Sequence, residues 1–389
     1  MNKLLLLACV LTLPGVAPVK AQERPRTVRQ TPRQAGKPEP VLESDEVVRV
    51  RTRVVFLDAL VKDRGTNEPV RGLSPENFRV LDEGRPRALS YFTREGDSRR
   101  PLALLLFVDL WAVYGRSHLK SADALGRLAS ALSKLAPEDE VALMTTWVEE
   151  GEEPGTPVTA VRMIEDFTRD RSKTTAALLS IPHLMREQER LLEDLASKRA
   201  RLTDDLRLDL AWRLSAIADE VIPLTGRFPN SQFVVVGITD DLFDLRKGER
   251  EEVTERTLRA GITFDGLVFN KSLGARFFFG MFNKMLLSPR GLSLHAADAL
   301  AEQTGGEVAH VGKPDDLAAG LERFINSLMA RYNLGFALDE REPDDGRLHS
   351  LTVKVAARDG RGRERKLLVR ARRGYYMSEA GRGAPAKRQ

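Results

Sequence analysis

Uninterrupted apolar runs that lead into acidic residues are the feature that most constrains the fold of this chain. Residues 102–108 read Leu-Ala-Leu-Leu-Leu-Phe-Val and are followed by Asp109, and the apolar segment 231–239 leads into Asp240 and Asp241. Strands without polar alternation are buried on both faces, which is typical of parallel sheets covered by helices on each side. The two runs therefore predict the centre of a mostly parallel sheet.

Helical and strand-like segments alternate between residues 99 and 331. Further strands are predicted at 140–147, 158–164, 262–269 and 308–311, and helices at 121–135, 254–260, 294–303 and 315–332. Strands that alternate with helices in this way are typical of a doubly wound α/β domain. The sequence therefore predicts an α/β domain at 99–331.

Both ends of this domain are flanked by segments with the two-residue period of half-buried strands. The pattern begins near Val48 and returns after Asn333, in residues 46–98 and 332–377. Each segment is too short to form a stable core alone. We expect the two segments to join into one small antiparallel β-sandwich, with the α/β domain inserted between them.

One charged stretch is too long for an average α/β domain. Between residues 183 and 221, leucines and other apolar residues recur three, four or seven positions apart, with charged pairs between them. A single helix here would run about 60 Å. The pattern allows two consecutive helices that pack on the domain, or a projection through which the chain oligomerises as a scaffold.

The two ends of the chain predict export and a basic tail. Residues 1–21 have a basic start, an apolar run of about ten residues and small residues before a cleavage point after Ala21, as in a secretory signal peptide. Residues 22–45 hold several prolines and read as a flexible linker. We therefore expect a periplasmic or secreted protein with no transmembrane segment after cleavage, and a basic tail at 378–389.

Cysteine content and charge exclude several classes of function. The chain has one cysteine, Cys9, within the expected signal peptide, so a disulfide scaffold or a Cys-rich metal site is excluded. Residues 358–389 hold eleven basic and three acidic side chains, so the formal net charge of +5 is concentrated at one end and the body is acidic. A nucleic-acid-binding domain would carry its basic charge on the folded surface, so no nucleic-acid partner is expected.

Four strings resemble a known family. They are Pro69–Gly84 (Pro-Val-Arg-Gly-Leu-Ser-Pro-Glu-Asn-Phe continuing to Asp-Glu-Gly), Leu300–Gly306, Tyr332–Phe336 and Val369–Tyr376. Together they resemble the bacterial VWFA-related proteins, secreted relatives of the von Willebrand factor type A domain. The resemblance covers residues 46–377 and implies a type A α/β domain between β segments.

The family resemblance also implies a metal-ion-dependent adhesion site with the pattern Asp-x-Ser-x-Ser after the first buried strand. Asp109 holds the first position, but the two serine positions are Trp111 and Val113, which cannot ligate a cation. The last acid of the pattern corresponds to Asp240 or Asp241. A Mg²⁺ ion would use Asp109, Asp240 and Asp241, but we expect a degenerate site that binds no metal.

The threonine of the family's site has no clear counterpart. Thr174, Thr175 and Thr203 are the candidates that the sequence offers. If Asp109 binds no cation, it is expected to cap a helix or to accept hydrogen bonds from its own loop.

No motif predicts an enzyme. The sequence has no paired histidine ligands, no GxSxG string and no phosphate-binding GxxxxGK string. We therefore expect a non-enzymatic, metal-independent protein-binding module, whose unidentified protein partner contacts Trp111, Val113 and Phe243 at the carboxyl ends of the strands. A self-associating scaffold and a Mg²⁺-dependent adhesion domain are the alternatives.

Overall fold

The computed structural model describes most of the chain between residues 53 and 377. The described ranges are 53–94, 99–112, 114–152, 155, 157–198, 212–241, 243–245, 248–270, 291–293, 296–339, 342 and 345–377. They belong to one compact unit that begins at Arg51. The signal peptide, linker and basic tail expected at 1–21, 22–45 and 378–389 lie outside the described residues.

A six-stranded sheet forms the centre of the α/β part, as the apolar runs predicted. Its order is β13-β11-β9-β5-β6-β7, and all neighbouring strands are parallel except β6 and β7. The strands are β5 (Leu102–Val108), β6 (Glu140–Glu150), β7 (Pro157–Thr168), β9 (Gln232–Thr239), β11 (Thr263–Phe269) and β13 (Val308–Val311). Every residue of β5 and of β9 is buried, which agrees with their central positions.

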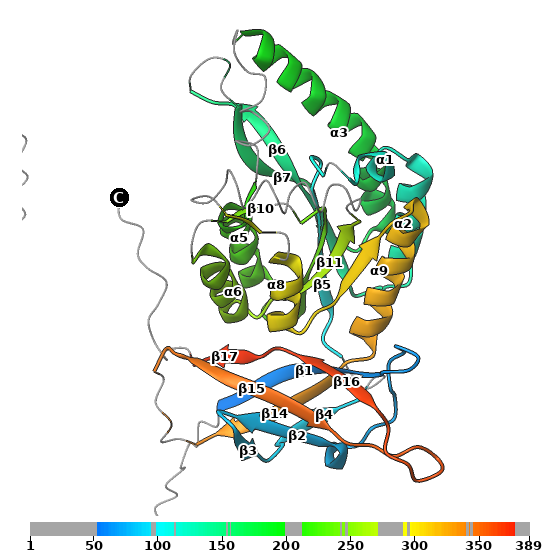
Figure 1. Ribbon diagram of the computed structural model, residues 1–389, viewed down its shortest axis with the longest axis vertical. Helices are drawn as coiled ribbons and strands as arrows, with labels where there is room; N and C mark the ends of the chain where they lie inside the picture. The colour runs from blue at the N-terminus through cyan, green and yellow to red at the C-terminus, as the bar shows by residue number, and fades with distance from the viewer. Residues whose placement is uncertain are drawn as a thin grey trace, which may run out of the picture. The chain divides into compact units, whose positions relative to one another are not determined.

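Helices cover both faces of this sheet (Figure 1). One layer consists of α2 (Ala122–Leu132), α3 (Arg171–Lys198) and α9 (Pro314–Met329), with the short α1 (Arg116–Leu119) beside them; the other consists of α5 (Leu214–Val221), α6 (Glu249–Arg259) and α8 (Ala296–Thr304). Local signals fix the helix starts. The hydroxyl of Ser121 accepts the N–H of Ala124 in α2, and Pro314 lies in the first turn of α9.

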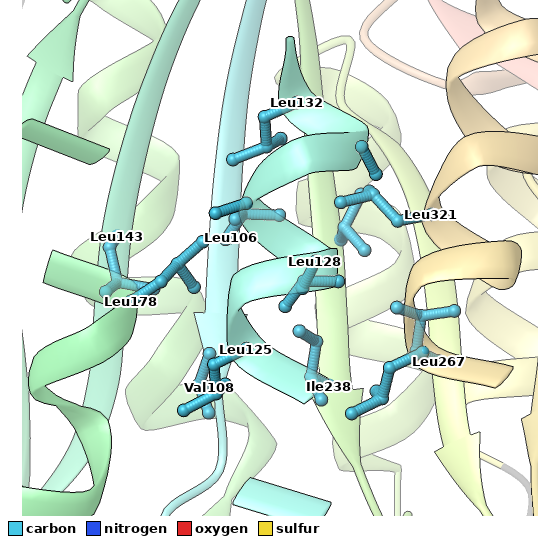
Figure 2. Close-up of a cluster of buried hydrophobic side chains, with 14 of the residues drawn as sticks. Leu106, Val108, Leu125, Leu128, Leu132, Leu143, Leu178, Ile238, Leu267 and Leu321 are labelled. Carbon is cyan, nitrogen blue, oxygen red and sulfur yellow. The ribbon is translucent and has the colours of Figure 1, made fainter. Parts of the chain in front are cut away.

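The main core lies between the sheet and the α2–α3–α9 layer. Figure 2 shows leucines of α2 pointing at side chains from the sheet and from α3 and α9. The side chains of this core are apolar and buried. Those labelled in Figure 2 are Leu106, Val108, Leu125, Leu128, Leu132, Leu143, Leu178, Ile238, Leu267 and Leu321. This packing fixes the strand ends from which the candidate site is built.

Strands from the two flanking segments pair with each other in two four-stranded sheets. The orders are β16-β1-β14-β4 and β17-β15-β2-β3. The strands are β1 (Arg53–Asp63), β2 (Phe78–Asp82), β3 (Arg85–Arg87), β4 (Tyr91–Thr93), β14 (Tyr332–Leu338), β15 (Leu348–Val355), β16 (Leu367–Ala371) and β17 (Gly374–Tyr376). One buried cluster, which includes Leu57, Val80, Phe336 and Leu351, draws on strands of both sheets.

Buried polar contacts join these two sheets to the α/β part at the amino-terminal ends of its parallel strands. The Nζ atom of Lys62 on β1 lies 2.7 Å from Oε1 of Glu307, just before β13, and both side chains are buried. Arg331 donates to the carbonyl oxygen of Gly305 at 2.8 Å. The carboxyl-terminal ends of β5 and β9 lie at the opposite edge of the central sheet.

The charged stretch at 183–221, for which the sequence allowed two consecutive helices or one projecting helix, contains parts of two separate helices, and residues 199–211 lie outside the described residues. α3 begins at Arg171 and contains Pro182 in its interior, whereas Trp212–Arg213 form the short strand β8 and α5 begins only at Leu214. β8 joins β10 (Phe243–Leu245) and β12 (Gly291–Ser293) in a small sheet. A proline such as Pro182 can lie within a helix when tertiary packing stabilises that helix.

Much of the apolar face of α3 is buried within the chain. Leu178, Ile181, Met185 and Leu195 of α3 are buried, while Leu179 is exposed. None of the described helices is both long enough and apolar enough to span a membrane.

Candidate functional site

The strand order identifies one edge of the central sheet as the place to look for a site. The chain runs from β5 outward to β6 and β7 on one side, and from β9 outward to β11 and β13 on the other. The carboxyl ends of β5 and β9 therefore meet where the winding direction reverses. Open α/β sheets commonly place their ligands at such a switch point.

Asp109 follows β5 at this switch point, and protein donors satisfy its carboxylate. Oδ1 accepts the backbone N–H of Trp111 at 3.0 Å and the hydroxyl of Thr146 at 3.2 Å. Oδ2 accepts the hydroxyl of Thr239 at 3.3 Å. The side chain is buried, and the backbone N–H of Asp109 donates to Ile238 of β9. The carboxylate therefore links the carboxyl end of β5 to its two neighbours, β6 and β9.

Burial and the negative charge of Asp240 both disfavour the ionised form of the Asp109 carboxylate. Burial, followed by the negative charge of Asp240, raises the pKa of Asp109 to about 7, although the bonds from Trp111, Thr146 and Thr239 act in the opposite direction. Two buried acids this close are stabilised when they share one proton or one cation. Asp240 also contributes, after burial, to a raised pKa of the half-buried Tyr114.

Asp241 forms hydrogen bonds in the turn after β9 and at the start of α8. Its backbone has a φ of 58°, a left-handed conformation that aspartate tolerates better than most residues. Its N–H donates to the hydroxyl of Thr239 at 3.0 Å. Its Oδ1 accepts the N–H of Ala297 in the first turn of α8 at 2.9 Å. This carboxylate therefore caps a helix, a favourable position for negative charge.

Trp111 lies over the edge between the two helix layers. Its partly buried side chain packs against the apolar clusters on both faces of the sheet. Its indole Nε1 is buried and, among the described residues, has no hydrogen-bond partner. Trp111 therefore packs largely into the protein at the position where the family pattern has a ligating serine.

Two other expected contact residues are only partly covered by the structure. Val113 lies outside the described residues, between Ala112 and Tyr114. Phe243 begins β10, which pairs with β8 and β12, but its side chain lies outside what the structure describes. Tyr114, which the sequence did not single out, is the described aromatic residue beside Asp240.

The threonines at the site are also different from those that the sequence offered. Thr174 and Thr175 lie in the first turn of α3, at the opposite edge of the sheet, where Arg171 donates to the carbonyl oxygen of Asp139 just before β6. Thr203 lies outside the described residues. The hydroxyls on Asp109 come from Thr146 and Thr239, and their positions at the ends of two predicted neighbouring strands were the signal that could have identified them.

The geometry around Asp109 does not fit a Mg²⁺ site. A cation needs oxygen lone pairs directed at it, whereas two hydroxyls and one N–H donate their protons to this carboxylate. Asp241 is placed differently, since its carboxylate accepts the N–H of Ala297 at the start of α8. Over the described part of the chain, no group of three or more His, Cys, Asp or Glu side chains is arranged to hold a metal ion.

Comparisons with known proteins identify similar solved structures at low identity. Von Willebrand factor type A from Catenulispora acidiphila aligns with a TM-score of 0.39 and 8% identity, over 82% of this chain and 73% of that chain. Proximal thread matrix protein 1 from the mussel byssus gives 0.36 and 8%, over 61% and 50%. The SpRpn10 VWA domain gives 0.29 and 10%, over 57% and 93%. No family model matches the chain, and no curated protein matches its sequence.

Proposed function

We propose that this chain is an exported, non-enzymatic protein-binding module that recognises its partner at the switch-point edge without a metal ion. The surface would be formed by Trp111, Tyr114 and the loops that follow β5 and β9. The observation that carries the proposal is the carboxylate of Asp109, both oxygens of which accept hydrogen bonds from protein donors. Protein donors that occupy this carboxylate support contact through surface shape and apolar area instead of through a shared cation.

The proposal includes membership of the VWFA-related family and a type A-like domain inserted in a β-sandwich. The four motif strings, together with the reversal of winding between β5 and β9, support a type A-like domain with a degenerate adhesion site. The pairing of β1 with β14 and β16 supports its insertion in a small β-sandwich. Export rests on the amino-terminal sequence alone, residues 1–21.

Capture from the host's envelope fraction tests the surface. The immobilised chain should retain a protein in the presence of EDTA as well as in the presence of Mg²⁺. Tyr114→Ala should lose it, because Tyr114 lies beside Asp240 at the switch point. Phe228→Ala is the matched control, since it truncates a half-buried aromatic side chain that packs on Phe167 and Phe233 before β9 begins.

Two results would contradict the proposal. Tight Mg²⁺ binding in a calorimetric titration, lost in Asp109→Ala, together with EDTA-sensitive capture, would support the Mg²⁺-dependent adhesion alternative. Equal loss of capture in Tyr114→Ala and Phe228→Ala would mean that the partner-binding surface does not lie at the switch-point edge. Circular dichroism spectra identical to that of the unchanged chain show that the variants are folded.

The scaffold alternative receives less support from the structure. Oligomerisation through α3 would need an exposed apolar face, but Leu178, Ile181 and Leu195 are buried within the chain, and Leu179 is the large apolar side chain of the described α3 residues that is strongly exposed. Light scattering at high concentration checks this alternative, and a concentration-dependent dimer that is lost on deletion of residues 186–205 would restore it.

A further inference from the structure

A crevice rich in arginine lies at the other end of the central sheet, far along the strands from Asp109. It opens where β1 and the residues beside β16 meet the amino-terminal ends of β5 and β11, and its volume is about 100 Å³. Three arginines contribute to its lining: Arg100, Arg331 and Arg372. Asp58 is the one carboxylate among the described residues that line it.

The arginines are unequally paired. Arg100 forms an ion pair with Asp58 at 3.0 Å. Arg331 and Arg372 each donate to one carbonyl oxygen, that of Gly305 and that of Phe56 respectively. Within the described residues neither of these two guanidinium groups lies within 4 Å of a carboxylate, and both Nε atoms are buried without a hydrogen-bond partner. Each guanidinium has five N–H donors, so most of this capacity is unused.

Burial makes this arrangement costly. Arg331 is 5% exposed, and a buried charge normally requires a partner. Burial lowers the pKa of Arg372, Asp58 opposes this effect, and the nearby positive charge of Arg100 adds to it. The like charges of Arg100 and Arg372 therefore destabilise one another, and Asp58 offsets this effect only in part.

Charges behind the crevice do not remove the excess. Glu307 is paired with Lys62 at 2.7 Å and lies 3.9 Å from Arg370. Asp265 is buried beside Arg331, and the positive charge of Arg331 acts to lower its pKa. The crevice and this cluster together hold five cationic side chains against three carboxylates: Lys62, Arg100, Arg331, Arg370 and Arg372 against Asp58, Asp265 and Glu307. The excess is two positive charges.

We propose that this crevice binds a phosphate group, as inorganic phosphate or as a phosphomonoester. A phosphate dianion balances the two excess charges, and guanidinium groups match its oxygens in pairs. A volume of about 100 Å³ equals roughly three water molecules, which is enough for one phosphate group.

The rim of the crevice distinguishes the two sources of phosphate. Phe56 lines the crevice and is 48% exposed, and its ring contacts that of Tyr91, which is 41% exposed, at a centroid distance of 5.3 Å. An aromatic phosphomonoester can contact these rings, whereas inorganic phosphate cannot. Tighter binding of phenyl phosphate than of inorganic phosphate would identify a phosphomonoester as the ligand, and equal binding would identify free phosphate.

Calorimetric titration of the full chain, in buffer free of phosphate and sulfate, tests the proposal. We expect saturable binding of inorganic phosphate, weakened about tenfold in Arg372→Gln because a charge-assisted bond is lost. Arg363→Gln is the matched control, since it removes the same charge from an exposed arginine paired with Asp359, and it should bind phosphate as the unchanged chain does. Arg331→Gln provides a second test, with circular dichroism to check its fold.

Three outcomes would overturn the site. They are the absence of saturable phosphate binding, equal weakening in Arg372→Gln and Arg363→Gln, and tighter binding of acetate than of either phosphate compound. The last result would mean that the crevice selects a carboxylate. None of these measurements depends on a protein partner, so failure here is distinct from failure of the proposed function.

Discussion

The buried ion pair between Lys62 and Glu307 gives the sharpest test of how the β sheets are held to the α/β part. Its atoms are 2.7 Å apart, and its side chains are 1% and 8% exposed. At an effective dielectric constant of about 20, the attraction is about 6 kcal/mol, and desolvation of the two ions offsets much of it. Removing one partner leaves the other charge buried, so Lys62→Met should lower the free energy of unfolding by about 3–5 kcal/mol.

Glu307→Met should be the more damaging single change. It deprives Lys62 of its partner and also removes the carboxylate 3.9 Å from Arg370, whereas Lys62→Met leaves Glu307 beside Arg370. The double variant replaces both charges with apolar groups of similar size. It should therefore regain most of the loss caused by Lys62→Met and lie within about 2 kcal/mol of the unchanged chain.

Urea unfolding followed by tryptophan fluorescence measures these differences at pH 7. Lys134→Met is the matched control, because Lys134 lies 2.7 Å from Glu322 but the two side chains are 47% and 40% exposed. The control should lose less than about 1 kcal/mol. The reasoning is refuted if Lys62→Met loses no more than Lys134→Met, or if the losses of the two buried single variants simply add in the double variant.

Three further changes test other parts of the structure. Gly306→Ala should prevent stable folding, because its Cβ would lie 1.8 Å from the carbonyl oxygen of Phe264; Gly360→Ala, which meets nothing within 4 Å, is its neutral control in thermal melts. Gly126→Ala, inside α2 with open space around it, should stabilise the chain by about 0.5–1 kcal/mol in urea unfolding. Asp109 holds a proton in the folded state up to pH about 7, whereas the unfolded chain releases it near pH 4. Its contribution to stability is therefore present at low pH and lost as the pH rises through 7. Asp109→Asn should accordingly melt higher than the unchanged chain at pH 8, but not at pH 4; equal melting at pH 8 would contradict the raised pKa.

The sequence predicted the centre of the fold better than its connections. The apolar runs correctly placed β5 and β9, because a strand buried on both faces needs apolar residues at every position. The antiparallel direction of β7 was not predictable from its composition. None of its residues is fully buried, as expected for an edge strand, and a hairpin-length connection to β6 allows the antiparallel direction.

The candidate site was predictable in part. Asp109, Asp240 and Asp241 follow the two central strands, so the sequence brought them to one edge of the sheet. The hydroxyls of Thr146 and Thr239 depend on which strands become neighbours, and that is decided by packing over the whole domain. The arginine crevice was not predictable at all, because Arg100 and Arg331 are distant in sequence and meet only when β1 packs against the α/β part.

The pairing of β1 has a consequence for the order of assembly during synthesis. β1 leaves the ribosome before any other described strand, but its neighbours β14 and β16 are among the last to be made. The intervening α/β part can form its own local contacts first, before β14 and β16 are synthesised. During that time both edges of β1 lack their partner strands. Unpaired strand edges recruit other chains, so a translation product that stops short of residue 332 would be prone to aggregate even with its α/β part complete.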